Sequence, residues 1–198
     1  MNLKNQIPEK KFIFLRRDYF LMSLSFLKNI YRDTIDAIND VRTETPLDEV
    51  PDKVFILPEY ALPKGVIAGV GKLYDGAKAM FVNAKAFYML PYSEKKAVMA
   101  HELGHLHKMA GGKLSDIVGT ENEMQSRILD ANFSGDYEEG SVNWVAQKLY
   151  PVSNVLKNAY REATNSFDSI MNAATDVPQT AENTYNMVLG KNCVCRYC

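Results

Sequence analysis

The run AVMAHELGHLHKMAGG, Ala97 to Gly112, contains two histidines four residues apart. Positions i and i+4 of an α-helix lie on one face, a single turn apart. His101 and His105 can therefore direct imidazole nitrogens at one point, at the Zn–N distance of about 2.0–2.1 Å. Glu102 projects beside them as a carboxylate that can take a proton from a water held at that point. The pattern His-Glu-x-x-His on a helix is typical of zinc metallopeptidases.

A bare match to this pattern also arises by chance, as three polar residues on one helix. Two features favour the metal site. Gly104 is a poor helix former, at about 0.8–1.0 kcal/mol relative to Ala, and this indicates that something approaches the backbone closely there. Two of the three histidines in the chain fall at ligand spacing. We therefore predict that His101 and His105 bind Zn²⁺, with Glu102 as the general base.

The surrounding sequence predicts an α+β fold. Ser93 as N-cap and Gly111-Gly112 as a stop signal bracket a helix over Glu94–Ala110. Helical patterns elsewhere predict helices at Tyr19–Val41, Glu121–Ala131, Tyr137–Tyr150, Asn154–Ala174 and Ala181–Leu189. Short runs rich in Val, Ile, Phe and Tyr predict strands at Lys53–Leu57, Gly65–Tyr74 and Ala77–Asn83, with a hairpin turn at Asp75-Gly76. We expect a small, mostly antiparallel sheet packed on the motif helix, with several flanking helices.

The stretch AHELGHLH after a predicted strand resembles the gluzincin metallopeptidases, and within them it is most similar to the ImmA/IrrE family. A second motif of that family is matched by EGSVNWVAQKLYP, Glu139 to Pro151, and the resemblance covers roughly residues 77–151. It implies a zincin-like domain, taken here as residues 1–190, that hydrolyses a peptide bond in a protein substrate. A separate regulatory protein, such as a DNA-binding repressor, is the substrate that the resemblance implies.

The resemblance also implies that a downstream glutamate completes the zinc site. The candidates are Glu121, Glu123, Glu138 and Glu139. Glu139 shares a helical face of small or polar residues with Asn143, whereas Glu138 stacks over an apolar stripe. The resemblance selects Glu139, with Asn143 bracing a ligand or a histidine. Glu138 and Glu123 are the alternatives, and the runs TENE and DYEE also fit capping boxes at helix starts.

For the substrate, we expect the strand Ala77–Asn83 to be the sheet edge along which an extended peptide pairs. No residue is assigned to stabilise the transition state. Tyr74, Tyr92, Tyr137 and Tyr150 are candidates, although each is equally explained by packing.

Composition bounds the remaining possibilities. The net charge of −1 gives no reason to expect nucleic acid as a direct partner. The apolar run Tyr19–Leu27 is shorter than the roughly 18 residues of a membrane span, and it lacks a small-residue cleavage site. All three cysteines lie in the last six positions, so there is no disulfide framework, and we expect a cytoplasmic protein.

Two other functions are open at this stage. The domain could be a non-catalytic metal-binding or protein-interaction module that retains a zincin shell. Alternatively, function could centre on the tail, residues 191–198. Its Cys193, Cys195 and Cys198 supply only three thiolates, one fewer than a closed structural zinc site needs.

Overall fold

The computed structural model describes residues 24–159 and 161–176. This part of the chain folds into seven α-helices and one three-stranded sheet, which confirms the predicted α+β class. Within it, no helix combines the length and apolar character needed to cross a membrane. The start of the first predicted helix, the predicted helix Ala181–Leu189 and the three cysteines lie outside the described residues.

The sheet is mixed, which corrects the expectation of mostly antiparallel pairing. Its strands are β1 (Lys53–Leu57), β2 (Ala68–Lys72) and β3 (Lys78–Asn83), in the order β1-β3-β2. β2 and β3 form the predicted antiparallel hairpin, but β1 runs parallel to β3. The segment between β1 and β2 carries the chain over to the other side of β3, and a parallel neighbour requires a crossover of this kind. The strand predicted to be the edge, Ala77–Asn83, is therefore the central strand, and β2 is an edge.

Two local features set the ends of β3: a turn before the strand and a helix cap after it. At its start, Gly76 adopts a φ of 81° and the turn is closed by the Leu73 amide donating to the Ala77 carbonyl at 2.9 Å. The turn therefore contains three residues rather than the predicted two. At its end, Asn83 accepts a hydrogen bond from the Ala86 amide and caps α2 (Ala84–Tyr88), a short helix that the sequence patterns did not predict.

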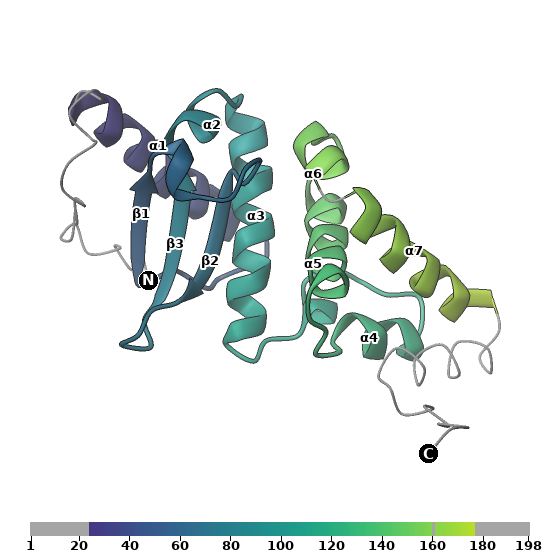
Figure 1. Cartoon of the computed structure of the whole chain (residues 1–198). Helices are drawn as coiled ribbons and strands as arrows, with labels where there is room; N and C mark the ends of the chain where they lie inside the picture. The colour runs from purple at the N-terminus through teal and green to yellow at the C-terminus, as the bar shows by residue number, and fades with distance from the viewer. Residues whose placement is uncertain (1–23, 160, 177–198) are drawn as a thin grey trace, which may run out of the picture.

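The motif helix α3 (Tyr92–Met109) packs on α1 (Leu24–Glu44) and contacts β2 (Figure 1). Pro91 stands at its N-cap position, so the prediction that Ser93 is the cap was wrong, and Ser93 lies inside the first turn. At the other end, Gly111 has a φ of 85°, in the left-handed conformation that commonly ends a helix. Of the twelve positions of α3 from Lys95 to Leu106, all except Lys96 are buried.

The helices after α3 form the second half of the molecule: α4 (Glu123–Leu129), α5 (Asp136–Leu149), α6 (Asn154–Ala159) and α7 (Arg161–Asp176). The range predicted as one helix, Asn154–Ala174, thus contains two. Neither predicted capping box forms, because Asn122 caps α4 and Gly135, with no capping side chain, precedes α5. α5 packs against both α3 and α7. Figure 1 shows α3 standing between the sheet and the α5–α7 group.

Candidate metal centre

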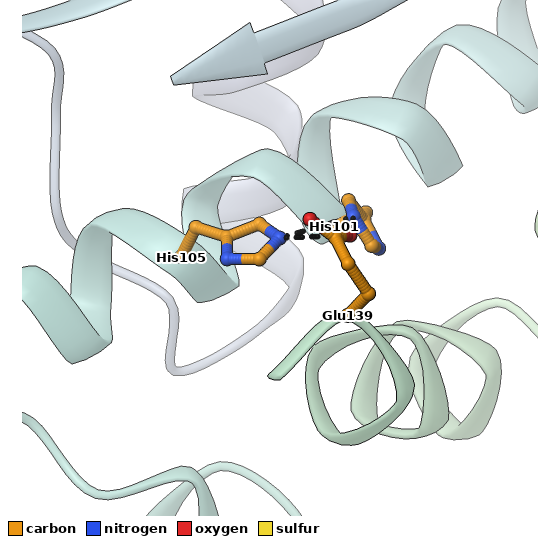
Figure 2. Close-up of side chains that lie close together, drawn as sticks. All are labelled: His101, His105 and Glu139. Atoms are coloured by element: carbon orange, nitrogen blue, oxygen red, sulfur yellow. Dashed lines mark hydrogen bonds and ion pairs between the residues drawn. The ribbon is translucent and has the colours of Figure 1, made fainter. Parts of the chain in front are cut away.

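Three ligand-type side chains meet where α3 faces the first turn of α5. His101 Nε2 and His105 Nε2 lie 3.2 Å apart, and Glu139 Oε2 is 3.1 Å from the first and 3.3 Å from the second. Figure 2 shows the two rings extending from one helix toward the carboxylate that rises from the other. Among the described residues, this is the one group of three or more His, Cys, Asp and Glu side chains close enough to hold a metal ion.

The triangle of short distances does not suit hydrogen bonds alone. Three contacts share three atoms, and two imidazole nitrogens that both donate to the carboxylate would bring two N–H groups against each other. In a tetrahedral zinc site with bonds of about 2.0–2.2 Å, neighbouring ligand atoms are about 3.3–3.5 Å apart. The observed separations of 3.1–3.3 Å are close to that spacing. The donor set of two imidazoles and one carboxylate is also one that catalytic zinc uses.

A close helix crossing brings the carboxylate within reach. At Gly104, between the two histidines, an added Cβ would lie 2.8 Å from Val142 Cγ1 of α5. A side chain at this position would push the two helices apart. The structure thus supplies the close approach that the sequence indicated at Gly104, and the object that approaches is α5, which carries Glu139.

Glu138 lies beside the triangle rather than in it. Its Oε1 is 3.4 Å from Nδ1 of His105, the ring nitrogen that faces away from the triangle. A carboxylate in this place can hold the tautomer and orientation of a ligating histidine. From the sequence, Glu138 is only an alternative metal ligand, because its contact with His105 depends on how α3 and α5 cross.

The other residues named from the sequence lie elsewhere, and Glu121 is exposed and outside the group of possible metal ligands. Glu123 is exposed on α4, where it accepts a hydrogen bond from Arg127 at 2.6 Å. Asn143 is fully buried, and its amide donates to the Leu156 carbonyl at 3.0 Å and to the Thr164 hydroxyl at 2.7 Å. Its amide nitrogen thus ties α5 to α6 and α7 instead of bracing a histidine directly, which corrects the role expected for it.

Glu102 is a buried acid at the same site. Its side chain is 3% exposed, and its environment contains charges from the histidines and Glu139 but no hydrogen bond from a described residue. Burial raises the pKa of Glu102, although the neighbouring histidines oppose the shift. A buried carboxylate without a hydrogen-bond donor is costly. Such a group is free to act on a molecule that enters the site.

Electrostatic coupling across the triangle favours charged ligand groups. Burial alone would raise the pKa of Glu139, but hydrogen bonds with His101 and His105 outweigh it and hold the pKa well below its usual range. Burial would lower the pKa of His105, yet the bond to Glu139 and the charges of nearby carboxylates raise it. The carboxylate is therefore ionised at neutral pH, in the state that binds a metal ion, whereas His105 must lose its proton before it can act as a ligand.

A cleft of about 1240 Å³ opens over the triangle. Its floor includes His101, Glu102 and His105, one wall is β2, and the other consists of the first turns of α5 and α7 and the end of α6. Of the four tyrosines considered earlier, none lines this cleft. Tyr92 and Tyr150 instead donate to Asp40 and Glu44 of α1. The described part of the chain thus places no tyrosine against the site.

A scan against protein-family models and searches of curated proteins and of solved structures found no match to this chain. The resemblance to the ImmA/IrrE family stays a prediction that rests on the two sequence motifs.

Proposed function

We propose that this protein is a zinc-dependent metallopeptidase. The observation that carries the proposal is the triangle of His101 Nε2, His105 Nε2 and Glu139 Oε2, with sides of 3.1–3.3 Å, on the floor of an open cleft. These three side chains would hold the ion and leave the cleft side open, as catalytic zinc sites do. The zincin-like fold and the ImmA/IrrE assignment belong to the same proposal.

When bound, zinc supplies Lewis-acid polarisation and makes a water molecule more acidic. The chain's own groups do the rest. Glu102, buried and without a hydrogen-bond donor among the described residues, faces the cleft and takes the proton of the attacking water. Its raised pKa suits it to pass that proton on to the leaving amine. Glu138 orients His105 through the second ring nitrogen.

The edge strand β2 offers a way to hold an extended substrate. The Asn83 amide donates to the Ile67 carbonyl, and the Leu73 amide donates to the Ala77 carbonyl, so alternate residues bond to β3. The backbone groups of Ala68 and Val70 therefore point away from β3, and both residues line the cleft. A peptide can pair with these groups by adding a strand to the sheet. The resemblance predicts that the substrate is a separate regulatory protein.

The proposal is tested by incubating the zinc-loaded protein with a proteome-derived peptide library and mapping new peptide ends by mass spectrometry. Glu102→Gln should keep the metal and slow cleavage by about 10²–10⁴-fold, the usual contribution of a general acid–base group. Glu123→Gln, an exposed acid on α4, is the matched control and should cleave normally.

The outcomes separate the candidate functions. Cleavage by Glu102→Gln at the wild-type rate would contradict the peptidase proposal. Bound zinc with no cleavage by the wild-type protein would point to the alternative, a non-catalytic metal-binding module.

A further inference from the structure

The two walls of the cleft differ in charge. The β2 wall contributes Val66, Ala68, Gly69 and Val70, none of which carries a charge. The opposite wall, from α5 to α7, contributes three carboxylates beyond the metal triangle and one guanidinium: Asp136, Glu138, Glu162 and Arg161. Glu102 and Glu139 on the floor would offset the charge of a divalent ion. The helical wall therefore gives the cleft a negative potential.

Two of these carboxylates have no ion-pair partner in the described ranges of the chain. Among the described residues, neither Asp136 nor Glu162 takes part in an ion pair, although several surface acids elsewhere do. Arg161 donates to Asn158 at 2.8 Å. Glu102, 3% exposed and without a hydrogen bond from a described residue, also faces this space. Negative charge thus reaches the cleft from the helical wall, and in the metal-free protein from the floor as well.

Helix stability explains part of this pattern. Asp136 and Glu162 stand in the first turns of α5 and α7, where carboxylates interact favourably with the helix dipole. The helix dipole explains why acidic residues occupy these first turns. It does not explain why both helices begin at the same cleft. Both first turns open onto one cleft, opposite an edge strand, and low-dielectric walls focus the field of like charges.

We infer that the cleft selects an extended polypeptide segment with basic side chains. The segment adds to the β2 edge at Ala68 and Val70, and its lysines or arginines project to Asp136 and Glu162 on the helical wall. This inference rests on the proposed function, because it names the substrate class of the same site. Uncharged backbone recognition on one wall gives binding, and the charged wall gives selectivity.

The inference is tested with full-length Glu102→Gln protein, in zinc-loaded and metal-free forms, to prevent turnover. Two fluorescein-labelled probes of equal length, one alternating Val and Lys and the other alternating Val and Glu, are titrated by fluorescence anisotropy. The Val-Lys peptide should bind at least about tenfold more tightly at low salt, and the preference should shrink at high salt as the charges are screened.

A pair of charge-matched variants locates the effect. Asp136→Asn with Glu162→Gln should remove most of the preference. Asp116→Asn with Glu121→Gln removes the same charge from exposed positions outside the cleft and should change it less than about twofold. Equal affinity for the two peptides, no binding of either, or the same loss in both double variants would overturn the inference.

Zinc content, measured on the same samples, keeps this inference separate from the proposed function. Bound zinc with equal peptide affinities contradicts the selectivity alone. A cleft-dependent preference for the Val-Lys peptide in a protein that binds no zinc supports the basic-segment cleft and contradicts the peptidase.

Discussion

Helix α3 presents polar side chains on two faces, toward α1 and toward α5. On the α1 face, each cation meets an anion: Lys95 Nζ is 2.7 Å from Asp33, and Lys96 Nζ is 2.7 Å from Glu44. On the α5 face, two imidazoles and a carboxylate face one another within 3.3 Å. No lysine or arginine of the described residues forms an ion pair in that second group.

The contrast shows what each face requires. On the α1 face, each of the two lysines neutralises an anion of α1, and these ion pairs link the two helices. The α5 face gathers two imidazoles, a carboxylate and a buried acid around one point, and no described residue donates a hydrogen bond to that acid, Glu102. Such a cluster is costly unless a positive charge, from a metal ion or a protonated histidine, neutralises its carboxylates. We therefore expect changes on the α5 face to alter metal binding and changes on the α1 face to alter stability alone.

The largest expected effect is on zinc affinity, and it differs between two adjacent glutamates. Glu139→Gln removes a metal ligand and should weaken zinc binding by more than 100-fold, whereas Glu138→Gln removes an outer contact to His105 and should weaken it by about 10–100-fold. Competition with a chromogenic chelator measures both affinities. If Glu138→Gln had the larger effect, the assignment of the third ligand would be reversed.

On the α1 face, Lys95→Met breaks the ion pair with Asp33 while keeping an unbranched apolar side chain that is one atom shorter. Lys95 is 6% exposed and its partner is half-buried. We expect the free energy of unfolding of the metal-free protein to fall by about 1.5–3 kcal/mol, as for a lost hydrogen bond between charged groups. Urea unfolding measures this, and zinc affinity should stay the same. A parallel loss of zinc would show that the two faces are not independent.

Gly104→Ala tests the helix crossing through the sign of its effect. Ala is the better helix former by about 0.8–1.0 kcal/mol, so the change would stabilise the protein if the position were free. Because Val142 lies 2.8 Å from the added Cβ, we expect destabilisation by about 1–3 kcal/mol together with weaker zinc binding. Adding Val142→Ala should restore both. A more stable Gly104→Ala with unchanged zinc affinity would show that the close crossing of α3 and α5 at Gly104 supports neither the fold nor the metal site.

A smaller effect is expected at the start of α3, where Glu94 accepts hydrogen bonds from Ser153 and from the Asn154 and Val155 amides at the start of α6. Burial would raise the pKa of Glu94, but these bonds lower it. The carboxylate therefore stabilises the fold above its unfolded pKa of about 4.3, and this is lost as the pH falls through the folded value.

Glu94→Gln should accordingly cost about 1 kcal/mol at pH 7. The difference from wild type should shrink on acidification below about pH 4. Urea unfolding of the metal-free proteins over a pH series measures it. A difference that persisted unchanged to low pH would show that the charge of Glu94 is not what stabilises α6.

The local elements were predictable from sequence and the pairings between them were not. The helix that carries His101 and His105, the three strands and the β2–β3 hairpin depend on periodicity and turn residues that are read within a few positions. The parallel β1–β3 pairing depends on the path of residues 58–67, which has no local signature. The central place of β3 in the sheet follows from that path, so the edge strand was misassigned.

The candidate site divides in the same way. The i, i+4 spacing of the histidines fixes their geometry within one helix. The positions of Glu138 and Glu139 depend on the crossing of α3 and α5, and adjacent residues of a helix point in different directions. The sequence resemblance favoured Glu139, while the contact of Glu138 with His105 Nδ1 emerged only from the packed structure.

The measurement that tests the central claim most directly is the zinc content of full-length protein by elemental mass spectrometry, with Cys193, Cys195 and Cys198 changed to Ser so that thiolates cannot contribute. His105→Ala is compared with His107→Ala, which lies on the same helix with its ring bonded to the Lys113 carbonyl. We predict one zinc per chain in the parent and in His107→Ala, and none in His105→Ala. Equal zinc content in the two histidine variants, or no zinc in the parent, would contradict the account.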